Sequence, residues 1–406
     1  MKLNDKEMIM ADAKLKEIAD ILLIHNDSES FILSLMGGKI GHALFFYYYY
    51  KYSRQEIYLE KCINIITEAI NVIPNIKNMN GTFSFAGGLA GFGWLLDNFN
   101  RNGEIDFEDN DFFSELSAIL FKEMKSLLDK NNFDFFYGAI GICWYFIKTN
   151  HKNIHEEKIR YFLKCMQNKA IYVDDTCYWE YNKVEDEKLK EINLGLAHGI
   201  PSLIVILSEI CKINNLKDES LKILKPSISL LINLKQDISS YHSFYPYMYD
   251  LVDQKIVNVN KKSRLAWCYG DLSVSWALLK GGIACNDAKI INYAKEIILY
   301  CTTRRHLKEE WVFNAIVCHG SAGNALLFKK FSNNIQNDEI EDAVKFWIAT
   351  TFSNDFTNEK YLFRDNPSNK SQKNHSLLEG IAGIGLVILS FISKNNLTWD
   401  ECLLLS

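Results

Sequence analysis

The sequence predicts an all-α protein, and more specifically an α/α toroid with one layer of helices inside and one outside. Only 5 prolines occur in 406 residues, which leaves room for long helices because proline breaks a helix interior. Several segments carry apolar residues at helical spacing. A short glycine motif recurs along the chain, and such recurrence is the mark of a repeat architecture.

The repeated motif is a glycine followed by two residues, a small residue and an apolar helical run. The shared glycines are Gly38, Gly88, Gly138, Gly199, Gly270, Gly320 and Gly380. Successive glycines are 50, 50, 61, 71, 50 and 60 residues apart. A step near 50 fits two helices of about 15 residues with their connections. We therefore expect residues 1–406 to form one domain of seven helical hairpins.

Helical spacing between the motifs predicts the other helix of several hairpins. These helices are expected at 58–73, 112–128, 220–234, 288–301 and 339–351. The glycines are expected to allow positive φ at the turn and close approach of neighbouring inner helices. An open solenoid would need polar capping repeats. Neither end of the chain shows one, so closure into a ring is favoured.

The longer steps indicate insertions, and two are expected, at 170–192 and 239–262. The first contains extended-looking stretches such as Ile171-Tyr172-Val173, and the second is dense in tyrosine around Tyr245, Tyr247 and Tyr249. Aromatic residues at such density fit either a small β-containing extension or a binding rim.

Composition excludes several classes of protein. The net charge of −5 offers no basic field for nucleic acid. No apolar segment follows a basic start, and the longest apolar runs, at 200–207 and 382–392, are too short to span a membrane. Ten cysteines without a signal peptide indicate reduced thiols and a cytoplasmic location. Seven of them are expected to be small core residues: Cys62, Cys143, Cys165, Cys211, Cys285, Cys301 and Cys402.

Metal-ligand residue types precede the glycine in two of the motifs. Cys268 occupies this slot in the fifth copy, and Cys318 with His319 in the sixth. If the loops are equivalent in space, these three residues meet at one end of a central cavity. Two thiolates and an imidazole suit zinc, and three protein ligands leave a fourth position open. Cys177 and His242 are conceivable alternative ligands, but they lie outside the repeat slots and are expected to be structural or loop residues.

Four more polar residues in or beside these slots are candidate catalytic groups. His198 could be an acid or base because its pKa lies near neutrality, although a lone His is more often a hydrogen-bonded core residue. Asp134 could assist it or be a helix N-cap. Arg264 could stabilise an anion or lie on the surface. Tyr269 could donate a hydrogen bond or only pack.

Together these motifs resemble the lanthionine synthetase C-like family, over nearly the whole chain. The matching elements are Asp134-x-x-x-Gly138, Ala197-His198-Gly199, Arg264-x-x-Trp267-Cys268-Tyr269-Gly270 and Cys318-His319-Gly320. The resemblance implies an α/α toroid with zinc on the two cysteines and His319. It also implies that His198 is the acid or base near the metal, that Asp134 orients or assists it, and that Arg264 and Tyr269 line the site.

The reaction that the resemblance implies is thioether formation in lanthipeptide (lantibiotic) biosynthesis. A Cys thiol of a precursor peptide, leader plus core, would add to dehydroalanine or dehydrobutyrine made by a separate dehydratase. The length fits a stand-alone cyclase, and the Lys-, Asn- and Ile-rich composition favours a bacterial source. An export transporter would be a further partner and could bring the protein to the inner face of the membrane.

Two other interpretations have to be weighed against a cyclase. One is a non-catalytic scaffold of the same fold that keeps zinc and binds glutathione or a peptide. The other is an α/α-toroid glycosidase, which needs a pair of carboxylates at the mouth of the ring. Only Asp134, Asp271 and Glu379 occupy motif slots, and no two of them form an obvious pair, which disfavours the glycosidase.

Overall fold

A computed structural model of the protein describes residues 3–24, 32–76, 81–105, 107, 110–149, 152–182, 190–253, 255–257, 261–353 and 374–406. Parts of the two predicted insertions, 183–189, 254 and 258–260, lie outside the described residues. The chain divides into two compact units, one formed by 1–108 with 305–406 and the other by 109–304.

The described part is mostly helical. Its α-helices are α1 (Asp5–Ile24), α2 (Lys39–Ser53), α3 (Glu56–Val72), α4 (Leu89–Asn102), α5 (Asn110–Asp129), α6 (Ala139–Lys148), α7 (Lys152–Lys169), α8 (Ile200–Ile210), α9 (Lys217–Asn233), α10 (Ile238–Tyr241), α11 (Asp271–Cys285), α12 (Ala288–Thr303), α13 (Ser321–Asn334), α14 (Asp338–Phe352) and α15 (Ile381–Ile392). Short 3₁₀ helices are η1 (Ile73–Asn75), η2 (Asn214–Leu216) and η3 (Trp399–Leu403). The five helices predicted between motifs are therefore confirmed as α3, α5, α9, α12 and α14.

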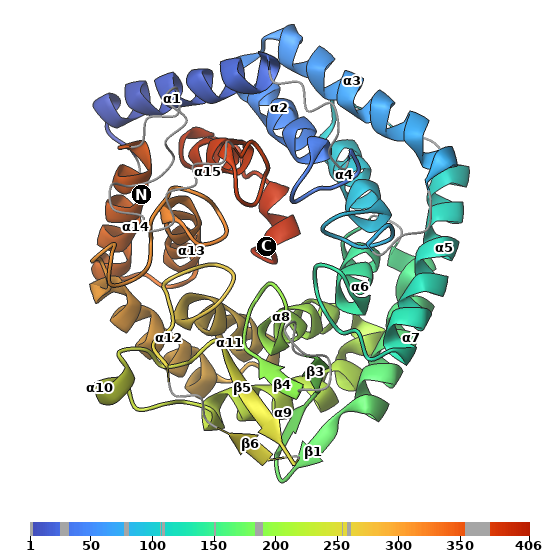
Figure 1. The fold of residues 1–406 in the computed structure, drawn as a ribbon, viewed down its shortest axis with the longest axis vertical. Helices are drawn as coiled ribbons and strands as arrows, with labels where there is room; N and C mark the ends of the chain where they lie inside the picture. The colour runs from blue at the N-terminus through green and yellow to red at the C-terminus, as the bar shows by residue number, and fades with distance from the viewer. Residues whose placement is uncertain are drawn as a thin grey trace. The chain divides into compact units, whose positions relative to one another are not determined.

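The first unit has a buried layer and an exposed layer of helices (Figure 1). In the buried layer, α13 packs against α15, α15 against α2, and α2 against α4. The exposed layer contains α14, α1 and α3, which contact α13, α15 and α2 respectively. Residues 40–50 of α2 are all buried, as expected for a helix that is apolar on every side. Helix α1, which the sequence analysis missed, covers α15 although the two lie near opposite ends of the chain.

The second unit repeats this arrangement and adds two small sheets. Helix α8 lies between α6 and α11, and α5, α7, α9 and α12 pack on these three. Strands β1 (Ile171–Val173) and β2 (Thr176–Tyr178) form an antiparallel pair. A four-stranded antiparallel sheet has the order β3-β4-β5-β6, with bounds β3 (Tyr181–Asn182), β4 (Lys190–Asn193), β5 (Met248–Val252) and β6 (Lys255–Val257). The predicted insertions thus supply a β extension.

Each of the seven motif glycines is the N-cap of a helix, but one of the two predicted reasons for glycine, a positive φ, is wrong at six of them. Only Gly270 has positive φ, at 96°. The other six are extended, with φ between −116° and −146°. Glycine is needed for close backbone approach instead: a Cβ on Gly199 would lie 2.1 Å from the Asn193 carbonyl oxygen.

Backbone hydrogen bonds join neighbouring motif loops at the position two residues before the glycine. In the first unit, Cys318 N donates to Leu378 O, Leu378 N to Met36 O, and Met36 N to Ala86 O, each at 3.0 Å. In the second unit, Ala197 N donates to Cys268 O at 3.4 Å. The loops that these bonds join are therefore equivalent in space and linked in repeat order.

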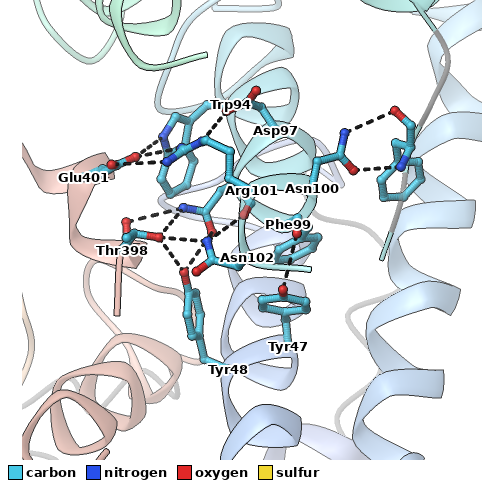
Figure 2. A network of polar contacts seen from close by, with 12 residues as sticks. Tyr47, Tyr48, Trp94, Asp97, Phe99, Asn100, Arg101, Asn102, Thr398 and Glu401 are labelled. Carbon is cyan, nitrogen blue, oxygen red and sulfur yellow. Dashed lines mark hydrogen bonds and ion pairs between the residues drawn. The ribbon is translucent and has the colours of Figure 1, made fainter. Parts of the chain in front are cut away.

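The C-terminal segment is fixed to α4 by buried polar contacts (Figure 2). Arg101 lies between two carboxylates: its Nε donates to Asp97 at 2.6 Å and its Nη2 to Glu401 at 2.9 Å. Thr398 Oγ1 accepts from Asn98 and Asn102, at 3.0 and 2.9 Å. These contacts hold η3 against a helix some 300 residues earlier.

In the second unit, a buried carboxylate ties three helices of the buried layer together, which allows a test by mutation. Glu209 of α8 pairs with Lys148 of α6 at 3.1 Å, Lys212 at 2.6 Å and Lys280 of α11 at 3.4 Å. Burial raises the pKa of Glu209, but the three ammonium groups outweigh burial and lower it to about 2. We predict that Glu209→Gln lowers the free energy of unfolding by roughly 3 kcal/mol, because three cations then lose their shared partner.

This stabilisation should be fully present above pH 4.5, the ordinary pKa of the group, and lost as pH falls towards 2. Urea unfolding at several pH values measures both effects. The matched control is Glu68→Gln, since Glu68 pairs with Lys39 at 3.1 Å but is 55% exposed and should contribute less than about 1 kcal/mol. Equal losses for the two variants would contradict the prediction.

Candidate functional site

The four predicted catalytic residues come together in the second unit, on three loops that lead into α6, α8 and α11. Asp134 precedes α6, His198 precedes α8, and Arg264 and Tyr269 precede α11. Each loop ends at a glycine N-cap, so the side chains just before the glycines gather at the same end of the buried helices.

His198 and Asp134 form the centre of this cluster. His198 Nδ1 shares a 2.6 Å hydrogen bond with Asp134 Oδ2. The other carboxylate oxygen, Oδ1, accepts the backbone N–H of Tyr137 at 2.7 Å within the loop; the N-cap of α6 is Gly138, so Asp134 is not the helix N-cap of its alternative interpretation. Phe136 contacts the imidazole edge-on, with ring centroids 5.3 Å apart. The imidazole orientation is therefore fixed on two sides.

The environment of His198 favours its protonated form. Burial lowers the pKa of the imidazole, but the hydrogen bond to Asp134 and the negative charge of that carboxylate outweigh burial, so the pKa lies above its ordinary 6.5. Because Nδ1 is bonded to Asp134, Nε2 is the ring nitrogen that can exchange a proton with another molecule. Within the described part of the chain, no hydrogen bond occupies Nε2.

Tyr269 lies beside His198, with ring centroids 6.2 Å apart, and is held by β4. The Asn193 side-chain amide donates to Glu191 at 2.9 Å and to the Tyr269 hydroxyl at 3.2 Å. Burial raises the pKa of Tyr269 well above its usual value, so the phenol stays protonated and can donate a hydrogen bond. Gly195 makes the approach possible, because a Cβ there would lie 2.6 Å from the Tyr269 ring.

Arg264 is held by a tyrosine from the second insertion. The Tyr247 hydroxyl accepts from the Arg264 backbone N at 3.1 Å and from its Nε at 3.4 Å. The Tyr247 ring also contacts Tyr269 edge-on, with centroids 5.6 Å apart. Arg264 is thus half-buried at the cluster and is not the surface arginine of its alternative interpretation.

A buried ion pair supports the loop that carries Cys268 and Tyr269. Asp271, the first residue of α11, accepts the backbone N–H groups of Phe244 and Tyr245, both at 3.0 Å. It also pairs with Arg304 at 2.9 Å, and both side chains are under 5% exposed. Because these contacts occupy its carboxylate, Asp271 is a structural residue and no candidate for acid–base chemistry.

The two cysteines among the predicted metal ligands occupy equivalent loop positions within their units, and His319 follows Cys318 directly. Cys268 and Cys318 both lie two residues before an N-cap glycine, at the position that carries the loop-to-loop hydrogen bonds. They are 7% and 9% exposed, and His319 is half-buried. Each residue offers one donor atom of the kind that zinc prefers. The chemistry of this donor set therefore fits zinc.

The two alternative ligands differ in their surroundings. Cys177 in β2 contacts Ile223 and Ser227 of α9, and burial raises the pKa of its thiol to about 11, which disfavours a thiolate. His242 caps the C-terminus of α10 with φ of 53°. Both placements agree with structural roles.

Sequence reasoning missed the residues that hold the candidate site in place. Tyr247 carries a weak sequence signal, because it belongs to the tyrosine-rich insertion, for which the sequence predicts either a β extension or a binding rim. Asn193 and Arg304 carry no sequence signal, because each reaches the site only through contacts that the fold creates between distant segments.

Comparison with known proteins shows the family. Residues 31–404 match the model of the lanthionine synthetase C-like proteins, and the chain belongs to this family. It is 23% identical over 287 residues to the nisin biosynthesis protein NisC of Lactococcus lactis subsp. lactis, an alignment that covers 68% of this chain. The chain spans 64% of the length of that curated relative.

A solved structure described as nisin cyclase superimposes with a TM-score of 0.76. The match covers 97% of this chain and 96% of the other, at 18% identity. The fold is therefore an α/α toroid with a small β-containing extension, as the sequence predicted. None of the described helices is long and apolar enough to cross a membrane.

The close approach at Gly195 provides a test of the site's construction. Its Cβ in Gly195→Ala would lie 2.6 Å from the Tyr269 ring and 2.9 Å from the Cys268 carbonyl oxygen. We predict a loss of about 1–3 kcal/mol of stability from overpacking, and a changed near-UV circular dichroism spectrum as Tyr269 moves. Gly37→Ala is the control, because its Cβ meets only Ser34 Oγ at 3.4 Å. Unchanged stability in Gly195→Ala would contradict this packing.

Proposed function

We propose that this protein is a zinc-dependent lanthipeptide cyclase, which adds Cys thiols of a dehydrated precursor peptide to dehydroalanine or dehydrobutyrine. The main support is the cluster of Asp134, His198, Tyr269 and Arg264 on the loops that carry the family motifs. A proton-carrying imidazole, a protonated phenol and a guanidinium meet the needs of a reaction that moves one proton and develops one negative charge.

Cys268, Cys318 and His319 are the residues that would hold zinc. Their donor types suit this metal, and the two cysteines occupy the same position of the fifth and sixth loops. Zinc, when bound, supplies Lewis acidity that lowers the pKa of a substrate thiol and so makes a thiolate available near neutral pH.

The remaining residues account for the proton and the charge. As the thiol sulfur bonds to Cβ of the dehydro residue, the C=C electron pair moves towards Cα and the adjacent carbonyl, which makes an enolate. Arg264 and Tyr269 carry N–H and O–H donors suited to that oxygen. His198 Nε2 then gives a proton to Cα, which completes the thioether. The proton that leaves the thiol balances the one that is added, so no other reactant is required.

The roles of His198 and Asp134 can be separated on this geometry. Both Asp134 oxygens already accept hydrogen bonds, one from Tyr137 and one shared with His198. Asp134 therefore orients the imidazole and stabilises its charged form, and His198 is the group that exchanges the proton.

The substrate and partners are part of the same proposal. A dehydrated peptide is the substrate that the proposed cyclase reaction requires, and a separate dehydratase that makes it is the partner that the family resemblance implies. The export transporter, and with it a place at the inner face of the membrane, stays a prediction of the family resemblance.

Metal content tests the ligand set. We predict one zinc per chain in the wild type and loss of zinc in Cys268→Ala and Cys318→Ala, measured by elemental mass spectrometry. Cys285→Ala is the control: it lies at the end of α11, where burial raises the pKa of its thiol to about 11, and it should keep full zinc. Retention of zinc in both ligand variants would contradict the assignment.

Substitution of His198 tests the catalytic role separately from the metal. His198→Asn should slow thiol addition to a dehydrated peptide by about 10²–10⁴-fold, the usual contribution of a general acid or base, with unchanged zinc content. Loss of alkylatable peptide thiol measures the rate. His306→Asn, at a position 68% exposed in the first unit, should behave as the wild type.

The same assay separates the cyclase from the non-catalytic scaffold. A scaffold would bind zinc and lose stability with a chelator but would never accelerate thiol addition. Wild-type protein with one zinc and no activity on a dehydrated Cys-containing peptide would therefore overturn the proposed function.

A further inference from the structure

The β extension contacts the candidate site at one end of its central strand pair. Strands β4 and β5 pair antiparallel, with Ile192 opposite Tyr249 and Asn193 opposite Met248. Leu194 N donates to Tyr247 O at 3.0 Å, which continues the ladder one step beyond the strands. Asn193 and Tyr247 thus lie beside each other at the same end of this pair.

Both residues hold a member of the cluster by a polar contact. The Asn193 amide donates to the Tyr269 hydroxyl at 3.2 Å. The Tyr247 hydroxyl accepts two hydrogen bonds from Arg264, one from the backbone N and one from Nε. The ring of Tyr247 also contacts Tyr269 edge-on. The extension therefore contacts both residues that are proposed to stabilise the negative charge developing on the substrate.

The contact on Arg264 decides where its guanidinium points. A free arginine side chain samples many rotamers, and this freedom opposes any single orientation of the guanidinium. The Tyr247 hydroxyl holds Arg264 at two atoms, the backbone N and the guanidinium Nε. Within the described residues, no hydrogen bond or ion pair occupies the two terminal Nη atoms. The arrangement restrains the base of the guanidinium and leaves its outer N–H groups for another molecule.

We propose that Tyr247 is a positioning residue, which aims Arg264 at the negative charge that develops on the substrate, and that the β4–β5 end is the platform for both charge-stabilising residues. This inference rests on the proposed function, because it assigns Arg264 an oxyanion to bind. Tyr247 and Asn193 both belong to the inserted segments or their borders. The β extension, rather than the helical layers, therefore has this role in the reaction.

The chain offers a matched pair of variants. Tyr247→Phe removes the hydroxyl and keeps the ring that packs on Tyr269. Tyr249→Phe makes the same change two residues on, where the hydroxyl donates to the Leu234 carbonyl oxygen at 2.6 Å and reaches no residue of the site. An effect of lost stability alone would appear in both variants, and an effect through Arg264 only in the first.

The first readout is kinetic. Tyr247→Phe should lower kcat for thiol addition by about 10- to 100-fold, as expected for a misaimed group, with KM and zinc content close to wild type. Tyr249→Phe should retain the wild-type kcat. In an Arg264→Gln background, Tyr247→Phe should cause no further loss, because a residue that acts through Arg264 is not additive with it. A wild-type kcat in Tyr247→Phe, or full additivity with Arg264→Gln, would overturn the proposal.

The second readout does not need catalysis. Phenylglyoxal modifies accessible arginine, and peptide mass spectrometry follows the rate at Arg264. The rate should rise severalfold in Tyr247→Phe and stay unchanged in Tyr249→Phe. Equal rates in wild type and Tyr247→Phe would overturn the positioning role. If the wild type adds no thiol to any peptide, the proposed function fails, and the labelling result still decides whether Tyr247 holds Arg264.

Discussion

The hydrogen bond between neighbouring motif loops is the contact on which the rest of the structure depends. It joins backbone atoms two residues before six of the seven capping glycines, as between Cys318 and Leu378 or between Leu378 and Met36. Because the bond uses only main-chain atoms, the side chain at this position can change without loss of the framework. Alanine, leucine, methionine and cysteine all occur there, and the two cysteines are the proposed zinc ligands. Main-chain hydrogen bonds therefore hold neighbouring loops together, while the side chains at the same position differ in their chemistry.

The same framework explains why two carboxylates beside the site differ in role. Asp271 is fully buried and neutralised by Arg304 and by two backbone N–H groups, so it anchors the loop before α11. Asp134 is 21% exposed and shares its hydrogen bond with a group that titrates. A carboxylate paired with a permanently charged cation stabilises the fold, whereas one hydrogen-bonded to an imidazole favours the protonated form of that imidazole. The residue type is the same, and the two carboxylates differ in their partners.

Much of the fold could be predicted because its signals are local. Helical apolar spacing placed α3, α5, α9, α12 and α14, and the recurring glycine placed the starts of the buried helices. The reason for glycine could be predicted only in part, since close approach was expected between helices and not within the loop itself. A positive φ is a property of one residue, but the need for space at Gly199 comes from the Asn193 carbonyl oxygen, which only the folded loop brings within 2.1 Å of a Cβ. Helix α1 was missed because no motif precedes it, although its packing on α15 covers an otherwise exposed apolar face.

For the candidate site, the sequence by itself determined which residues are candidates for the chemistry. His198, Asp134, Arg264, Tyr269 and the Cys and His residues stand out because their types are rare in loops that otherwise repeat. The tertiary structure alone decided how they are held. Asn193 and Tyr247 meet Tyr269 and Arg264 across 76 and 17 residues of sequence, through a sheet register set by long-range strand pairing. Helical periodicity can be recognised within a short segment of sequence, whereas a side-chain contact of this kind depends on long-range packing that no short segment specifies.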